Sequence, residues 1–335
     1  MKQYQRNIIG IFLTLTIVFS GLFGYIYFNP YVSATVVRRA FDVGIAKPPE
    51  NYDEIRAQVD VQENLVYPSV ETDNIFDLYK PKNATGMEPV IIWVHGGAFV
   101  GGDKADITEY SVLLAQRGFV VANMNYQRAP EANYPSQIIQ VGELYSHLSS
   151  NRDLYNLNMD KVFYAGDSAG AHIVSQFVLV QNDAAYSEKV GIKPVMAPNT
   201  IAGVGLFSGP YDLNEILSFA DFGKGALDFF FERIGWAYFG EKNWRQGDYI
   251  DELTIIDYVN EDFPPAFVTD GNTMTFTQDG LKLVDSLENL GVDETAAFYD
   301  ESEAELVHEY QFIMTLEQSQ MTFERFVEFL VRVAG

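Results

Sequence analysis

The stretch that decides the fold is Lys161–Val162–Phe163–Tyr164–Ala165–Gly166–Asp167–Ser168–Ala169–Gly170. β-Branched and aromatic residues lead into a Gly-x-Ser-x-Gly pattern, and a helix-permissive run from Ala171 to Gln181 follows. This order predicts a strand, a sharp turn and a helix, the arrangement called a nucleophile elbow. The turn leaves the Ser168 hydroxyl exposed at the strand tip and aims the free N–H groups of the helix N-terminus at the reacting oxygen. We therefore predict that Ser168 is a nucleophile; the alternative is a glycine-rich turn with a capping serine.

A second glycine-rich loop lies upstream of the elbow. Residues 90–94 form a continuous apolar run, which predicts a buried parallel strand, and this run ends in His95–Gly96–Gly97–Ala98–Phe99. Because glycine tolerates unusual dihedral angles, such a loop can turn backbone N–H groups inward. We expect the N–H groups of Gly97 and Ala98, with Gly96 as a further candidate, to join that of Ala169 in an oxyanion hole.

The general base is predicted by elimination among the four histidines, which are His95, His147, His172 and His308. In hydrolases with this elbow the chain order is serine, acid, histidine, so only His172 and His308 qualify. His172 lies one turn along the helix that Ser168 opens, where its side chain cannot easily reach over the serine. His308 follows a predicted strand at residues 295–299 and an acidic loop at residues 300–305. We therefore expect His308 to take the Ser168 proton.

A third motif completes a family pattern. Tyr126–Gln127–Arg128–Ala129–Pro130–Glu131, with Pro135 after it, stands between the glycine-rich loop and the elbow. With these three motifs, residues 60 to 335 resemble an α/β-hydrolase of the hormone-sensitive-lipase and esterase type, near the feruloyl-esterase-like group of small carboxylesterases. The resemblance implies hydrolysis of carboxylic esters through an acyl-enzyme, without a metal or an organic cofactor. It does not imply one substrate, because this fold hosts many chemistries.

The catalytic acid is where the chain departs from the family pattern. Family members usually place an Asp a few residues beyond the penultimate strand, here predicted at residues 264–269, and Met274 or Thr275 occupies that place. We favour Asp270, which directly follows the strand and precedes a turn-forming glycine. Two alternatives stay open: Asp279, near the start of the next helix where a capping role competes, and Asp212, which follows the previous strand.

Composition and pattern set the fold class. Strands and helices alternate from Val90 onward, which predicts an α/β fold with a mostly parallel sheet and helices on both faces. The formal net charge of −24 argues against nucleic acid or anionic lipid head groups as partners. We expect the partner to be a small-molecule ester.

Residues 213–262 interrupt the alternation and predict an inserted helical cap over the active site. The aromatic residues of this stretch provide a wall for the acyl or alcohol part of a substrate, or they form the cap's own core. They are Phe219, Phe222, Phe229, Phe230, Phe231, Trp236, Tyr238, Phe239, Trp244, Tyr249 and Tyr258.

The N-terminus predicts a membrane attachment. The run from Ile8 to Phe28 contains no charged residue and has about the length that crosses a bilayer. Lys2 and Arg6 precede it, so residues 1–7 are expected in the cytoplasm and the hydrolase domain, residues 61–335, outside the cell. Residues 29–60 are expected to form a tether. The alternative is a signal peptide cleaved near Ala34, which would release a secreted enzyme.

These features predict a serine hydrolase that cleaves small or medium acyl esters outside the cell by a Ser-Asp-His mechanism. A peptidase or amidase of the same fold would carry the same residues. A catalytically silent hydrolase fold used for binding is the third hypothesis, because no Asp stands at the family's usual position.

Overall fold

A central β-sheet organises the protein in the computed structural model, which describes residues 16, 18, 20, 21, 24, 25, 27–41, 44–85, 88–198, 200–214 and 226–335. Within these residues, eight strands form one sheet in the order β1-β2-β4-β3-β5-β6-β7-β8. β2 runs antiparallel to both of its neighbours, β1 and β4, and the other neighbouring pairs are parallel. The strands are β1 (Val59–Val66), β2 (Ile75–Pro81), β3 (Pro89–Val94), β4 (Val120–Met124), β5 (Asn158–Asp167), β6 (Ile201–Phe207), β7 (Ala266–Thr269) and β8 (Glu294–Ala297). The mostly parallel sheet predicted from the sequence is confirmed.

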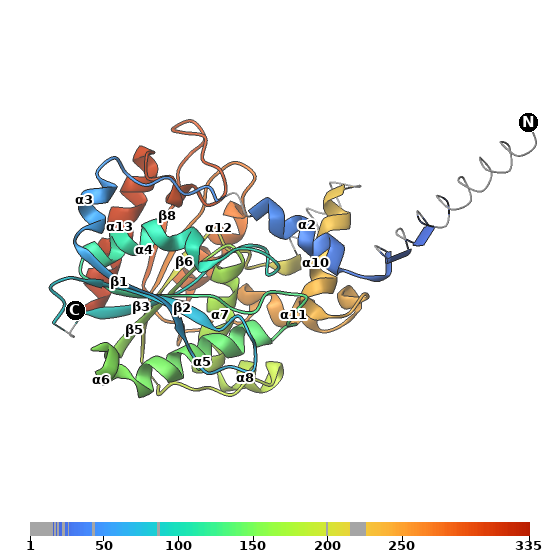
Figure 1. Cartoon of the computed structure of the whole chain (residues 1–335), viewed down its shortest axis with the longest axis horizontal. Helices are drawn as coiled ribbons and strands as arrows, with labels where there is room; N and C mark the ends of the chain where they lie inside the picture. The colour runs from blue at the N-terminus through green and yellow to red at the C-terminus, as the bar shows by residue number, and fades with distance from the viewer. Residues whose placement is uncertain are drawn as a thin grey trace, which may run out of the picture.

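Helices cover both faces of this sheet (Figure 1). On one face lie α4 (Thr108–Gln116) and α13 (Glu317–Ala334), with α3 (Tyr52–Arg56) packed on α4. On the other lie α5 (Ser136–Ser150), α7 (Ala169–Asn182) and α12 (Thr277–Leu290), with α8 (Ala184–Val190) beside α7 and the short α6 (Arg152–Tyr155) after α5. The predicted layers of helix, sheet and helix are therefore present.

Strand β3 shows why the sequences of the central strands are continuously apolar. Successive side chains of a strand point to opposite faces of the sheet. Val90, Ile92 and Val94 enter the core under α5 and α7, whereas Ile91 and Trp93 enter the core under α4 and α13. Because helices cover both faces, both sets are buried and no polar alternation remains in the sequence.

The parallel register places the functional loops together. Strands β3, β5, β6, β7 and β8 all run in the same direction, so their carboxyl ends meet at one edge of the sheet. The loops that carry His95, Ser168, Asp270 and His308 all emerge at this edge. In open α/β sheets this edge is where ligands bind.

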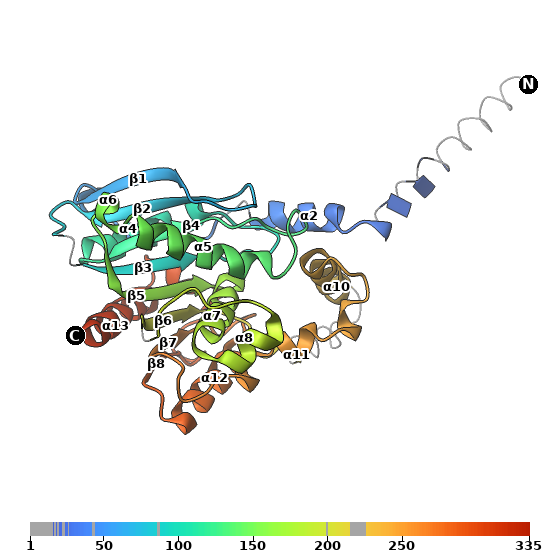
Figure 2. The ribbon, with the colours of Figure 1, turned by 90° about the horizontal axis from the view of Figure 1, so that it is seen from below.

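Residues beyond β6 form the predicted cap over that edge (Figure 2). It contains α10 (Ala226–Phe239) and α11 (Tyr249–Leu253), together with short 3₁₀ turns at Trp244–Gln246 and Ile255–Asp257. Two further 3₁₀ turns, Lys104–Ile107 and Tyr310–Phe312, belong to the α/β body.

The segment expected to be a tether is folded against the body. Helix α2 (Tyr31–Phe41) packs on α10, with Ala34 buried. Arg38 fixes it: Nε donates to the Val100 carbonyl at 2.6 Å and Nη2 to the Ala129 carbonyl at 3.0 Å. The same guanidinium forms a two-pronged ion pair with Glu131, at 3.0 and 2.7 Å. Part of residues 29–60, which were expected to form a tether, is thus a helix held on the body, because the planar Arg38 fork finds four acceptors there.

The predicted membrane segment, residues 8–28, lies mostly outside the described residues. None of the helices that the structure does describe has both the length and the apolar character needed to cross a bilayer.

Candidate active site

The turn after β5 holds Ser168 in a strained conformation. Its φ of 50° and ψ of −118° are rarely adopted by a residue with a side chain, and such strain is typical of functional sites. The turn lies so close to its surroundings that only glycine fits on either side. A Cβ atom at Gly166 would lie 2.5 Å from the Gly170 carbonyl carbon, and one at Gly170 would collide with the Val94 carbonyl oxygen. The predicted elbow is therefore formed, and α7 begins directly after the serine at Ala169.

The structure brings the predicted base to the predicted nucleophile. His308 Nε2 lies 3.1 Å from Ser168 Oγ, which is hydrogen-bond distance. The loop of His308 is fixed by Asn272, whose Oδ1 accepts from the Leu306 N–H at 2.9 Å and whose own N–H donates to the Leu306 carbonyl at 2.8 Å. Sequence reasoning missed Asn272, because its partners lie more than thirty residues away along the chain.

Asp270 is the carboxylate beside His308. Its side chain is 2% exposed, and its Oδ1 lies 3.5 Å from His308 Nδ1. The backbone N–H groups of Gly271 and Phe276 each donate to this carboxylate at 2.7 Å, which fixes its direction. The 3.5 Å separation is longer than a formed hydrogen bond, and such contacts often tighten only when substrate is bound.

The two alternative acids serve other contacts. The Asp279 carboxylate accepts the N–H groups of Tyr211 and Asp212, both at 3.1 Å, and so holds the loop after β6. Asp212 forms an ion pair with Lys282 at 3.3 Å. Of the three candidates, the structure brings only Asp270 to within 4 Å of His308.

The surroundings of His308 favour its protonated form. Burial opposes a charge on the ring, but the nearby Asp270 carboxylate and the negative charge of Glu309 outweigh it and raise the pKa of His308 above its ordinary value. A base with a raised pKa accepts the serine proton more readily.

The loop after β3 is the loop predicted to hold the oxyanion. Positive φ angles of 109° at Gly97, 52° at Ala98 and 63° at Phe99 curl the chain here. Among the described residues, no acceptor pairs with the N–H groups of Gly97 and Ala98. The Ala169 N–H belongs to the first turn of α7, where helix N–H groups have no intrahelical partner. Ala98, Ser168 and Ala169 line the same cavity, so the N–H groups of Ala98 and Ala169 suit a developing oxyanion. Gly97, the third candidate, directly precedes Ala98 and lines a separate pocket with Gly96 and Asp167.

Gly96, the further oxyanion candidate, is engaged elsewhere. Its N–H donates to Asp167 Oδ2 at 2.7 Å, while Asp167 Oδ1 accepts from Trp93 Nε1 at 2.8 Å. Asp167 thus joins the elbow to the oxyanion loop. Burial, followed by the neighbouring Glu309 carboxylate, raises the pKa of Asp167 well above its usual range. The sequence signal for this role was a carboxylate directly after the apolar run of residues 162–166.

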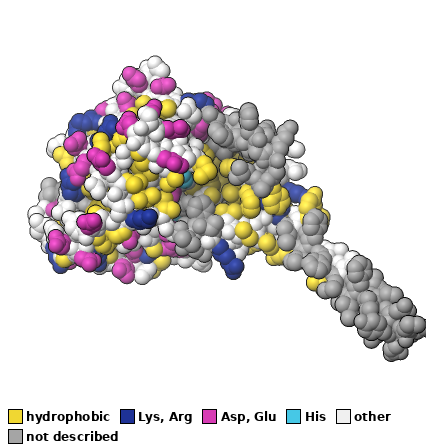
Figure 3. All heavy atoms as spheres, turned by 90° about the horizontal axis from the view of Figure 1, so that it is seen from above, with side chains coloured by type: hydrophobic (Ala, Val, Ile, Leu, Met, Phe, Trp, Pro, Cys, Tyr) yellow, Lys and Arg dark blue, Asp and Glu magenta, His cyan; other side chains and the backbone are white. Residues whose placement is uncertain are grey.

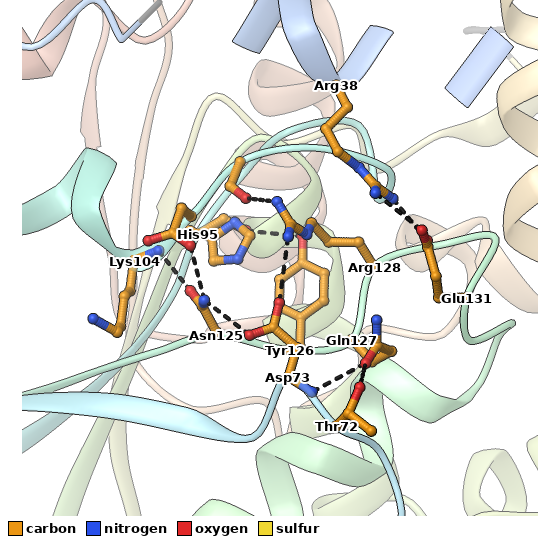
Figure 4. Close-up of polar contacts among 12 residues, drawn as sticks. Arg38, Thr72, Asp73, His95, Lys104, Asn125, Tyr126, Gln127, Arg128 and Glu131 are labelled. Carbon is orange, nitrogen blue, oxygen red and sulfur yellow. Dashed lines mark hydrogen bonds and ion pairs between the residues drawn. The ribbon is translucent and has the colours of Figure 1, made fainter. Parts of the chain in front are cut away.

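The segment from Tyr126 onward supports the oxyanion loop from outside (Figure 4). The Tyr126 ring stacks on His95 with centroids 4.4 Å apart, and the Ala129 N–H donates to the Phe99 carbonyl at 2.9 Å. Arg128 donates to the Gly102 carbonyl at 2.8 Å and lies 3.5 Å from Asp73. This third motif therefore holds the loop and does not enter the chemistry.

His172 connects the body to the cap. Its Nε2 lies 2.9 Å from the Leu253 carbonyl of α11, and burial lowers its pKa to about 4. A neutral imidazole can donate one hydrogen bond to that carbonyl. His172 is therefore a structural link, in agreement with its exclusion as the base.

An apolar cavity of about 110 Å³ lies beside Ser168 and under the cap. Four of the predicted cap aromatics line it, namely Phe231, Tyr238, Phe239 and Trp244. The Trp244 ring lies against Gly235, where a Cβ atom would overlap it. Phe219 and Phe222 lie outside the described residues, whereas Phe229 and Phe230 are exposed. The cap thus supplies both a cavity wall and its own packing.

Comparison with solved structures shows the same fold. An inhibited esterase B from Lactobacillus rhamnosis superimposes with a TM-score of 0.72 at 21% identity, covering 91% of this chain and 94% of that one. A bacterial heroin esterase gives a TM-score of 0.68 at 18% identity, covering 89% and 91%. At these identities the likeness establishes the α/β-hydrolase fold.

Sequence relatives are more similar over shorter segments. The acetyl esterase of Salmonella schwarzengrund is 32% identical over 152 residues, 45% of this chain and 43% of that protein. The isoprenylcysteine alpha-carbonyl methylesterase ICME of Arabidopsis thaliana is 31% identical over 121 residues, 36% of this chain and 28% of that protein. The matched segment spans less than half the length of either relative.

The family model named BD-FAE matches residues 76–278, from β2 to the start of α12, which is more than half of the chain. This range includes the oxyanion loop, the elbow and Asp270, and the solved esterases share the fold around them. The chain therefore belongs to the BD-FAE family of α/β-hydrolases.

Proposed function

We propose that this protein hydrolyses carboxylic esters by a Ser168–His308–Asp270 mechanism. The observation that carries the proposal is the 3.1 Å contact between His308 Nε2 and Ser168 Oγ, next to N–H groups that have no acceptor among the described residues. Relatives named acetyl esterase and methylesterase support the same chemistry.

The geometry gives each residue a step. Ser168 Oγ attacks the ester carbonyl carbon while His308 Nε2 takes the hydroxyl proton. The carbonyl oxygen becomes an oxyanion that accepts from the N–H groups of Gly97, Ala98 and Ala169, each such donor typically being worth about 10²–10³ in rate. Asp270 stabilises the imidazolium. When the tetrahedral intermediate collapses, the carbon–oxygen bond to the alcohol breaks and His308 returns the proton to the leaving oxygen.

A water molecule then completes the cycle. His308 takes a proton from the water as its oxygen attacks the acyl-enzyme carbonyl, and the same three N–H groups hold the second oxyanion. The bond to Ser168 Oγ then breaks and His308 returns its proton to that oxygen, which releases the acid and restores the serine.

The cavity favours short acyl groups. Its volume of about 110 Å³ is smaller than the ~150 Å³ apolar cavity that accommodates benzene in an engineered protein. Its walls are nearly all apolar, so a few methyl or methylene groups fill it without leaving a polar group unpaired. We therefore propose acetyl to butyryl esters as the preferred class.

We also propose a membrane location, which the sequence of the N-terminus supports. The uncharged run of residues 8–28, with Lys2 and Arg6 before it, supports a single-pass anchor that leaves the catalytic domain outside the cell. Cleavage after Ala34 would cut α2 beside a residue that is 1% exposed. A mature N-terminus at Thr35 would contradict the anchor.

The test is a series of p-nitrophenyl esters from acetyl to palmitoyl, run beside peptide anilides with the full chain in detergent. We expect the highest kcat/KM between two and four acyl carbons and no detectable anilide cleavage. A preference for anilides would move the protein to the peptidase class. Inertness of a folded preparation toward every compound would favour a binding role.

A further inference from the structure

Aromatic side chains gather where the apolar N-terminal run meets the folded domain. Tyr25, Tyr27, Phe28 and Tyr31 are 54%, 51%, 74% and 44% exposed, respectively. Large exposed aromatics in consecutive turns are unusual on a soluble surface and typical of the interfacial zone of a membrane.

Cap residues fix this junction to the domain. Arg233 of α10 donates to the Tyr27 carbonyl at 3.2 Å and to the Asn29 carbonyl at 2.6 Å. Lys242 Nζ lies 4.0 Å from the centre of the Tyr27 ring and 5.5 Å from that of Phe28. The end of the apolar run is therefore placed against α10.

Helix α10 extends the aromatic surface. Phe229 and Phe230 are 50% and 36% exposed, with ring centroids 6.0 Å apart, and Arg233 lies 5.7 Å from the Phe229 ring. We define the aromatic face as Tyr25, Tyr27, Phe28, Tyr31, Phe229 and Phe230. In the space-filling view, hydrophobic side chains gather along this junction between the body and the N-terminal segment (Figure 3).

The same helix forms a wall of the acyl cavity. Phe231, Ile234, Tyr238 and Phe239 of α10 line the space beside Ser168. One helix thus carries aromatic residues that face solvent and others that face the reacting serine. Whatever covers the aromatic face lies next to the cap of the active site.

We propose that the aromatic face seats the cap on the outer surface of the bilayer that holds residues 8–28, so that the enzyme takes short acyl esters carried by amphiphilic molecules in that surface. The inference rests on the proposed anchor and esterase function. The occupant is the interfacial layer of a zwitterionic phospholipid membrane, because the apolar run ends at this face. Lys242 and Arg39, both exposed, can meet lipid phosphates, while the net charge of −24 disfavours strongly anionic membranes.

The absence of cysteine from the sequence allows one site to be labelled at a time. Phe229→Cys puts a bimane label on the aromatic face. Leu154→Cys on α6, 75% exposed and on the opposite side of the body, is the matched control. Each full-length variant is reconstituted in phosphatidylcholine vesicles with and without lipid carrying a doxyl quencher near the head group.

We expect the doxyl lipid to quench the Phe229→Cys label at least threefold more than the Leu154→Cys label. If both labels are quenched equally and weakly in protein that floats with the vesicles, the aromatic face does not lie on the membrane, although the anchor still holds. Protein that fails to float overturns both. Self-quenching of the Phe229→Cys label on mixing labelled molecules, without lipid quenching, would show a second copy on the face and also contradict the proposal.

Activity separates this inference from the proposed function. The Phe229→Ser/Phe230→Ser variant changes exposed residues that do not line the cavity. We expect it to lose at least fivefold in the rate on an acetylated long-chain alcohol held in vesicles, and to keep the wild-type rate on water-soluble p-nitrophenyl acetate. Equal rates on the vesicle ester contradict the seating, whereas a wild-type protein inactive on both esters contradicts the esterase function.

Discussion

One set of residues maintains the backbone conformation of Ser168, and another set makes its hydroxyl reactive. The strain at its backbone is stabilised by close packing of the glycines around it, whereas its reactivity requires His308 and the free N–H groups. Single-residue changes can therefore separate the chemistry from the folding.

Asp270→Asn tests the catalytic acid. An amide cannot stabilise the imidazolium and favours the wrong ring tautomer, so we expect kcat to fall by about 10³–10⁴. Asp279→Asn keeps an oxygen for the N–H groups of Tyr211 and Asp212 and should change kcat less than about tenfold. Steady-state kinetics on p-nitrophenyl acetate with both variants measures the difference, and equal losses would contradict the assignment.

The pH profile tests the surroundings of His308. The base must be neutral to accept the serine proton, so kcat/KM falls as the pH drops through the pKa of His308. Because that pKa is raised, we expect the midpoint of this acidic limb above 6.5 in the wild type. Glu309→Gln removes a nearby negative charge that raises the pKa. The midpoint should therefore move to lower pH.

The matched control is Glu303→Gln, which removes the same charge from an exposed position in the preceding loop. We expect it to leave the midpoint unchanged. An acidic limb that does not move in Glu309→Gln, or that moves equally in both variants, would show that Glu309 does not act on His308.

The order of the strands in the sheet brings the active-site residues together. Adjacent parallel strands β3, β5, β6, β7 and β8 deliver their loops to one edge, so residues distant in sequence meet. Helix α10 lies over that edge and forms a wall of the acyl cavity.

Ile234→Ala tests the role of α10 in substrate choice. Removing three carbon atoms from the cavity wall gives space for a longer acyl chain, and each methylene accommodated is worth about tenfold or more in kcat/KM. We expect the ratio of hexanoyl to acetyl hydrolysis to rise about tenfold. Ile250→Ala, a cap residue that packs in the same cluster without lining the cavity, should leave the ratio unchanged. A shift common to both variants would indicate general loosening of the cap.

The sequence predicted the elements that have local signals. The strand at residues 90–94 and the elbow at Ser168 were readable because continuous apolar runs end in glycine-rich loops. The sequence favours Asp270, directly after the strand, but leaves Asp279 and Asp212 open as alternatives. Which carboxylate lies beside His308 depends on where the His308 loop passes the turn after β7. The Asn272 hydrogen bonds to Leu306 fix this position, and they join segments that are distant in the sequence.

For the whole molecule, the main difference from the sequence prediction is α2. Its sequence shows no signal for docking, because the acceptors of Arg38 lie on the oxyanion loop and on the segment that supports it. Part of the segment expected to form a tether thus contacts the loop and the motif that support the active site.

Arg38→Ala tests this attachment. The ion pair with Glu131 is partly exposed, so we expect the free energy of unfolding to fall by only about 1 kcal/mol and Tm by about 2 °C. Arg39→Ala removes the exposed neighbouring arginine and should leave Tm unchanged. Thermal unfolding of the full chain in detergent measures both variants, and identical Tm shifts would show that the Arg38 contacts do not stabilise the domain.

The central claim is that His308 makes the Ser168 hydroxyl nucleophilic. Its most direct test is the reaction of the folded protein with a fluorophosphonate, followed by peptide mass spectrometry to locate the adduct. We expect one adduct, on Ser168, formed at least 10³-fold more slowly in His308→Ala and absent from Ser168→Ala. An adduct on another residue, or a His308→Ala protein that reacts as fast as the wild type, would contradict the claim.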